Sequence, residues 1–152
     1  MNIYLDIDGT LLHKDGTPAN YLFEFLDYVV NNHDVYWLTT HCRGGVNCAV
    51  EHMTMRNNIS PEIIALLNCV HETDWQALKA EAIDYTKDFI WLDDYIMESD
   101  ENILKQHNVA QNGINVNLRE NPDELKEILN WLKEKTPWHQ IKSLDLESEV
   151  KL

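Results

Sequence analysis

Ile3-Tyr-Leu-Asp-Ile-Asp-Gly-Thr10 is the stretch around which the rest of the chain can be ordered. It begins with apolar strand formers, which predict a buried β-strand over about residues 3–7, and then turns to two carboxylates, a glycine and a threonine. Asp6 and Asp8 are therefore expected where a strand ends, at the sheet edge where open α/β folds bind ligands. Two such carboxylates repel, so a cation, a shared proton or a positive neighbour should offset their charge. Mg²⁺ suits hard oxygen ligands of this kind, and Gly9 lets the backbone approach a ligand closely.

Acidic residues are abundant in this chain, so the alternative is that Asp6 and Asp8 are solvated loop acids. The formal net charge is −14, from 12 Lys and Arg against 26 Asp and Glu. A polyanion is repelled overall, which argues against nucleic acid as the main ligand. A small phosphorylated molecule held at a locally positive site is still compatible with this charge.

The length and the cysteines indicate a single domain in a reducing compartment. We assign residues 1–136 of the 152 to one domain and expect residues 137–152 to form a C-terminal tail that frays. Three cysteines are an odd number, and no signal-peptide pattern precedes them, so reduced thiols in a cytoplasmic protein are expected. No apolar run has the length of a membrane span, which predicts a soluble protein.

Apolar runs typical of strands alternate with segments of helical periodicity. Strands are expected over about residues 3–7, 35–38, 89–92 and 114–118, and helices over about 19–32, 46–56, 75–85, 100–107 and 121–135. Residues 63–67 fit either a further strand or a helical turn opened by Pro61. Such alternation predicts a parallel sheet with helices on both faces.

Polar residues follow three of the predicted strands directly. Thr39 and Thr40 come after the strand at 35–38, and Asp93 and Asp94 come after the strand at 89–92. Because parallel strands point the same way, these residues should gather with the acids of the first strand at one edge of the sheet.

Four segments together resemble the motifs of the haloacid dehalogenase superfamily. They are Asp6-Ile-Asp-Gly-Thr10, Trp37-Leu-Thr-Thr40, Lys79 and Trp91-Leu-Asp-Asp94, within a match that spans roughly residues 1–118. The first motif is the most specific of the four and the lysine the least. The resemblance implies a Rossmann-like three-layer sandwich with a mainly parallel sheet of about five strands.

The resemblance also implies a reaction. Asp6 corresponds to the nucleophile of the family and Asp8 to its general acid and base, and an aspartate at the second position is typical of the phosphatases and phosphotransferases. Asp6 would attack phosphorus and form an aspartyl-phosphate, while Asp8 protonates the leaving oxygen and later activates water. Mg²⁺ would be held by Asp6, the Asp8 backbone carbonyl and Asp93, with Asp94 beside them or as an alternative ligand.

The phosphate-binding groups implied by the resemblance are a threonine and a lysine. Thr39 would donate its hydroxyl to a phosphoryl oxygen, and Lys79 would hold that oxygen and Asp6. Backbone N–H groups near Gly9 and Thr40 are further expected donors. Two alternatives remain open, because Lys87 competes with Lys79 and Thr40 competes with Thr39.

The residues after the second strand allow two readings. His41, Cys42 and Arg43 either line the mouth of the pocket or cap the next helix. A zinc site built from His41, Cys42, Cys48 and His52 is not predicted, because the paired Cys-x-x-Cys spacing is missing.

Relatives in this superfamily often carry a cap domain over the site, but residues 11–18 and 41–76 leave no room for a full one. An open site is expected, which suits a phosphoprotein, a sugar or nucleotide phosphate, or turnover of many monoesters, with closure by an oligomer partner as a further option. A phosphotransferase with the same intermediate and a non-catalytic phosphate- or partner-binding module are the alternatives to a phosphatase.

Overall fold

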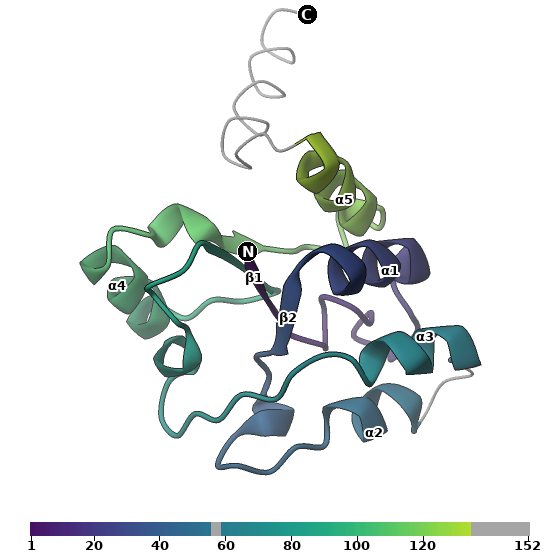
Figure 1. Cartoon of the computed structure of the whole chain (residues 1–152), viewed down its shortest axis with the longest axis horizontal. Helices are drawn as coiled ribbons and strands as arrows, with labels where there is room; N and C mark the ends of the chain where they lie inside the picture. Colours follow the sequence, from purple (N-terminus) through teal and green to yellow (C-terminus); the bar gives the residue numbers. More distant parts are fainter. Residues whose placement is uncertain (56–58, 135–152) are drawn as a thin grey trace, which may run out of the picture.

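A computed structural model describes residues 1–55 and 59–134 of the chain (Figure 1). Its centre is a parallel sheet in the order β2 (Asp34–Trp37), β1 (Asn2–Leu5), β3 (Phe89–Asp93) and β4 (Gly113–Asn115). Leu5 lies opposite Trp37 on one side and Leu92 on the other, so β1, β2 and β3 end at the same edge. The expected open α/β arrangement, as in Rossmann-like folds, is thereby confirmed.

Helices cover both faces of this sheet. They are α1 (Leu22–Asn32), α2 (Ala49–Thr54), α3 (Pro61–Leu67), α4 (Glu98–Gln106) and α5 (Glu124–Glu134), with short 3-10 helices η1 (Thr40–Cys42), η2 (Lys79–Ala82) and η3 (Ala110–Asn112). In Figure 1, α1, α3 and α5 lie to one side of the strands and α4 lies to the other.

The side chains of β1 alternate between two apolar clusters, as a strand covered on both faces requires. Ile3 and Leu5 belong to the larger cluster, which includes the buried faces of α1 and α5. Tyr4 points into the smaller cluster, where it joins Trp91 of β3 and Leu104 of α4. The strand with Asp6 at its end is therefore fixed from both sides.

The prediction of five strands is wrong for the described residues, which form four. Residues 63–67 belong to helix α3, since the Ser60 hydroxyl caps the Ile63 N–H at 3.3 Å and Pro61 takes the first helical position. The place beside β2 is taken by a single residue, His71. Its carbonyl accepts from the Trp37 N–H and its own N–H donates to Val35, both at 2.8 Å, so the fifth strand is reduced to one bridge.

The helix expected over residues 75–85 is also wrong, apart from the 3-10 helix η2. Trp75, Ala80 and Ile83 are all buried, but only the one short turn of η2 forms between them. The Glu81 carboxylate holds the turn by accepting from the Leu78 N–H at 3.0 Å.

Several expected boundaries shift. The helix predicted over 46–56 covers Ala49–Thr54, α4 begins at Glu98, and α5 begins at Glu124 and not at 121. The predicted tail at 137–152 lies outside the described residues, which end at 134. Among the residues that the structure describes, no helix has the length and apolar character needed to cross a membrane.

Candidate functional site

Acids from two strands meet at the carboxyl edge of the sheet. Asp6 follows β1 and its N–H donates to the Leu92 carbonyl at 3.0 Å, which sets it beside Asp93, the last residue of β3. Only 7% of Asp6 and 1% of Asp93 are exposed. One carboxylate oxygen each of Asp6, Asp93 and Asp94 lies within 4.8 Å of the others. The structure thus brings together three of the acids that the sequence nominates.

Lys79 lies between two of these acids. Its Nζ is 2.7 Å from Asp93 Oδ2 and 3.3 Å from Asp6 Oδ1. The lysine is held in place by η2, because the Ala80 N–H donates to the buried Asp100 carboxylate at 2.9 Å. Lys87, the alternative lysine, is exposed and precedes β3 at the opposite edge of the sheet.

Burial and neighbouring charges together set the pKa values of these groups. Burial raises the pKa of Asp6, and burial together with the Asp6 charge raises the pKa of Asp93 to about 8. Burial alone lowers the pKa of Lys79, but the charges of Asp6 and Asp93 outweigh it and raise that pKa. The lysine therefore stays charged and offsets part of the repulsion between the acids.

Asp94 contacts the loop that follows β1. Lys14 Nζ is 2.6 Å from Asp94 Oδ2. Gly9 has a φ of +80°, and a Cβ on it would lie 2.7 Å from the same oxygen. This close approach explains the glycine in the first motif. Lys14 was not expected here, since only the folded loop brings it to Asp94.

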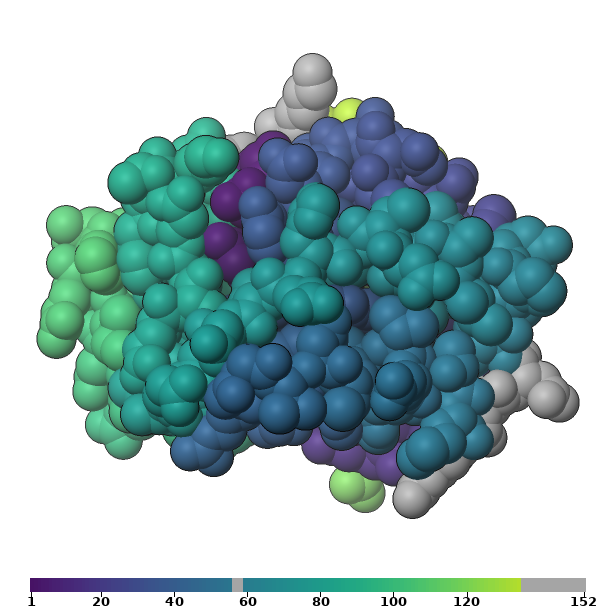
Figure 2. Space-filling model, turned by 60° about the horizontal axis from the view of Figure 1, so that its bottom comes forward, coloured from purple at the N-terminus to yellow at the C-terminus, as the bar shows by residue number. Residues whose placement is uncertain are grey.

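Asp8 is held by two histidines. Its Oδ1 is 2.9 Å from His52 Nε2 and its Oδ2 is 3.3 Å from His41 Nε2. The two imidazole rings stack with centroids 3.7 Å apart and planes 20° from parallel. Partial burial raises the pKa of Asp8, but the hydrogen bonds from His52 and His41 outweigh it and lower that pKa. In Figure 2 the blue segment that contains η1 and α2 lies at the lower centre of the surface, next to purple residues of the N-terminal part.

These histidines were considered at the sequence level only in other roles. His41 was expected either at the pocket mouth or as a helix cap, and the contact of His52 with Asp8 has no counterpart in the predictions. Among the described residues, no cysteine thiol belongs to the group of Asp8, His41 and His52, and the buried Cys42 thiol donates to the Asn47 side chain at 3.5 Å.

The two threonines differ in burial. Thr39 is 1% exposed, its hydroxyl accepts from the His41 N–H at 3.4 Å, and its carbonyl accepts from Trp75 Nε1 at 3.1 Å. Thr40 is exposed and begins η1. The Gly9 N–H, one of the expected phosphate donors, donates to the Leu12 carbonyl at 2.7 Å and is not free for a ligand in this conformation.

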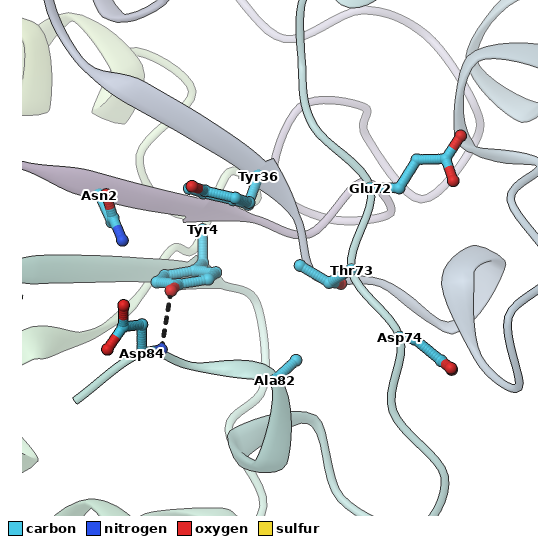
Figure 3. A pocket seen from close by; sticks show the side chains of 8 residues that line it. All are labelled: Asn2, Tyr4, Tyr36, Glu72, Thr73, Asp74, Ala82 and Asp84. Carbon is cyan, nitrogen blue, oxygen red and sulfur yellow. Dashed lines mark hydrogen bonds between the residues drawn. The ribbon is translucent and has the colours of Figure 1, made fainter. Parts of the chain in front are cut away.

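A cavity of about 200 Å³ lies away from these residues (Figure 3). The Tyr4 and Tyr36 rings stack in it with centroids 5.3 Å apart, and the Asp84 N–H donates to the Tyr4 hydroxyl at 2.9 Å. None of the nominated acids, threonines or lysines lines it.

No protein-family model, no curated protein and no solved structure matches this chain. The functional inference therefore depends on the side chains and their geometry.

Proposed function

We propose that this chain is a Mg²⁺-dependent phosphatase of the haloacid dehalogenase type, which hydrolyses a phosphate monoester through an aspartyl-phosphate on Asp6. The observation that carries the proposal is the meeting of Asp6 with Asp93 and Asp94 at one sheet edge, with Lys79 between the first two. Two acids on adjacent strand ends that share a lysine suit the binding and transfer of a phosphoryl group.

The donor set fits a hard divalent cation. Three carboxyl groups converge there beside two lysines, Lys79 and Lys14, and a bound cation would favour the ionised forms of Asp6 and Asp93, whose pKa values are raised without it. The group consists of oxygen ligands, which Mg²⁺ prefers. Asp6, Asp93 and Asp94 would hold the ion together with the Asp8 backbone carbonyl. When bound, it neutralises the charge between an anionic nucleophile and an anionic substrate.

The reaction has two displacements. A carboxylate oxygen of Asp6 bonds to phosphorus as the bond from phosphorus to the leaving oxygen breaks, and the protonated form of Asp8, which the hydrogen bonds from His52 and His41 disfavour, gives that oxygen a proton. Asp8 then takes a proton from water, the water oxygen bonds to phosphorus, and the bond to Asp6 breaks to release phosphate. The Asp8 side chain is 46% exposed, so water and a leaving group can reach it.

Lys79 and Thr39 stabilise the transferred group. The charged Lys79, already 3.3 Å from Asp6, can donate to a phosphoryl oxygen as well, and the Thr39 hydroxyl supplies a neutral donor. The exposed Thr40 is the alternative donor.

The substrate class depends on whether a cap domain covers the acids. Neither the loop after β1 nor the η1 to α3 segment provides a full cap, so a phosphoprotein or a small sugar or nucleotide phosphate fits. The net charge of −14 disfavours a nucleic acid. We place the protein in the cytoplasm, with its cysteines reduced.

The test is hydrolysis of an aryl phosphate by the full chain with Mg²⁺. We expect Asp6→Asn to reduce turnover by more than about 1,000-fold, as loss of a nucleophile does in other enzymes. Asp15→Asn, on the exposed loop, is the matched control and should keep full turnover. An intermediate trapped on Asp6 and seen by mass spectrometry would support the mechanism, whereas undiminished turnover in Asp6→Asn would exclude it.

The same assay separates the alternatives. If added alcohols increase total turnover and appear as phosphorylated products, the chain is a phosphotransferase. If a panel of phosphate esters gives no turnover but inorganic phosphate binds, the chain is a binding module.

A further inference from the structure

Asp6, Asp93 and Asp94 are one group of side chains that could hold a metal ion. A second such group consists of Asp8, His41 and His52. They come from three separate segments, since Asp8 follows β1, His41 lies in η1 and His52 lies in α2. One ligand atom from each lies within 4.8 Å of the other two. Two imidazoles and one carboxylate are a common ligand set for a divalent transition metal.

The separations between the ligand atoms suit a bound ion. For a tetrahedral zinc ion with nitrogen and oxygen ligands at about 2.0–2.2 Å, neighbouring ligand atoms lie roughly 3.3–3.6 Å apart. Asp8 Oδ2 and His41 Nε2 are 3.3 Å apart, and Asp8 Oδ1 and His52 Nε2 are 2.9 Å apart, so an ion would replace two hydrogen bonds and need the second pair to separate slightly. The stacked rings both present Nε2 to the carboxylate, so the ligands are already oriented.

The backbone fixes both histidines independently of any ion. The His41 N–H donates to the Thr39 hydroxyl at 3.4 Å and the His41 carbonyl accepts from the Cys48 N–H at 2.9 Å. The His52 N–H donates to the Cys48 carbonyl at 2.8 Å. Cys48 thus connects the two segments through its main chain, and such preorganisation favours tight metal binding.

The group of Asp8, His41 and His52 is accessible to solvent, and its imidazole nitrogens favour a transition metal. The side chains of His41 and His52 are each 26% exposed and that of Asp8 is 46% exposed, so an ion can enter and keep a position for water. Imidazole nitrogen suits zinc, nickel or copper and not Mg²⁺, which takes oxygen ligands.

We propose that Asp8, His41 and His52 form a binding site for a divalent transition metal, with Zn²⁺ as the representative ion. The site is separate from the oxygen-only cluster of Asp6, Asp93 and Asp94. A consequence, which rests on the proposed function, is that Zn²⁺ inhibits hydrolysis by occupying the carboxylate of the general acid and base.

Metal binding is measured on the full chain after chelator treatment, by competition for Zn²⁺ with a chromophoric chelator. Wild-type protein should bind one Zn²⁺ that His41→Ala and His52→Ala each weaken by at least about 10-fold. His71→Ala is the matched control and should leave the affinity unchanged, since His71 contacts β2 through its main chain. Co²⁺ should give the visible absorption of a site with nitrogen ligands, and that absorption should disappear in His52→Gln.

Two outcomes would overturn the proposal. One is an affinity for Zn²⁺ that is the same in wild type, His41→Ala and His52→Ala, all shown to be folded by thermal unfolding. The other is the absence of Zn²⁺ binding by the wild type. Asp6→Asn separates this proposal from the previous one, because it should be inactive and still bind Zn²⁺.

Discussion

Replacing Gly9 by alanine tests the contact that places Asp94 in the site. Gly9 and Gly45 both have a φ of +80°, so an alanine at either position adopts a left-handed backbone that costs about 1–2 kcal/mol. The surroundings of the two glycines differ. A Cβ at Gly9 would lie 2.8 Å from Asp94 Cβ, whereas one at Gly45 would lie 3.7 Å from the nearest atom, in ordinary contact.

The additional cost at Gly9 follows from that distance. Asp94 Cβ is attached to the main chain, so rotating the carboxylate does not relieve the overlap and the backbone has to move, at about 1–3 kcal/mol. The broken ion pair with Lys14 adds little, because the Lys14 side chain is 75% exposed. We expect Gly9→Ala to lower the free energy of unfolding by about 2–5 kcal/mol and Gly45→Ala by about 1–2 kcal/mol.

Urea unfolding gives the free energy of unfolding of both variants, provided that its slope against urea concentration equals that of the wild type. Asp94→Gly in the Gly9→Ala background should recover the additional loss, because it removes the overlapping Cβ. Equal destabilisation of Gly9→Ala and Gly45→Ala would refute the reasoning. Mg²⁺ should also raise the unfolding temperature of Gly45→Ala more than that of Gly9→Ala, where Asp94 is displaced.

Three further predictions concern the scaffold. Ser60→Ala should lower the free energy of unfolding by about 1 kcal/mol, because it removes the hydroxyl that caps α3, whereas Ser60→Thr keeps that hydroxyl. If the two variants are equally stable in urea, the cap does not contribute to stability. Asp100→Ala should lower the free energy of unfolding by about 1–3 kcal/mol, because the buried Ala80 N–H loses its acceptor, and Asp100→Asn should lower it by less. A higher unfolding temperature for Asp100→Ala than for Asp100→Asn would contradict this. Tyr85 donates its hydroxyl to the Ala80 carbonyl, and burial raises its pKa to about 12, so its contribution to stability is complete below pH about 10 and is lost as the pH rises towards 12. Tyr85→Phe should therefore lose less stability than wild type over that range, and an unchanged pH profile would argue against the burial of the Tyr85 hydroxyl.

The meeting of Asp6 with Asp93 could be predicted because it depends on strand alternation alone. Each acid follows a buried apolar run, and parallel pairing in register then brings the two ends together. Lys79 was nominated by the resemblance to the superfamily, with Lys87 as its competitor, and the folded connection ahead of β3 brings Lys79 to the two acids. The catalytic roles of these residues remain predictions.

The remaining contacts depend on how loops pack, which has no periodic signal. His52 lies on a short helix whose face towards Asp8 is set by η1, and Lys14 reaches Asp94 only after the loop has closed. The helix expected over 75–85 is wrong because side chains bind the main chain there, Glu81 at the Leu78 N–H and Asp100 at the Ala80 N–H. The fifth strand failed because a single residue, His71, leaves no pattern to detect.

That single bridge has a consequence for the outer edge of the sheet. β2 is the outer strand on its side, and an outer strand offers free N–H and C=O groups on which another chain can extend the sheet. His71 occupies two of these groups, at Val35 and Trp37, with one residue. A deletion that withdraws His71 would expose this edge, and the expected result is association of chains edge to edge through β2.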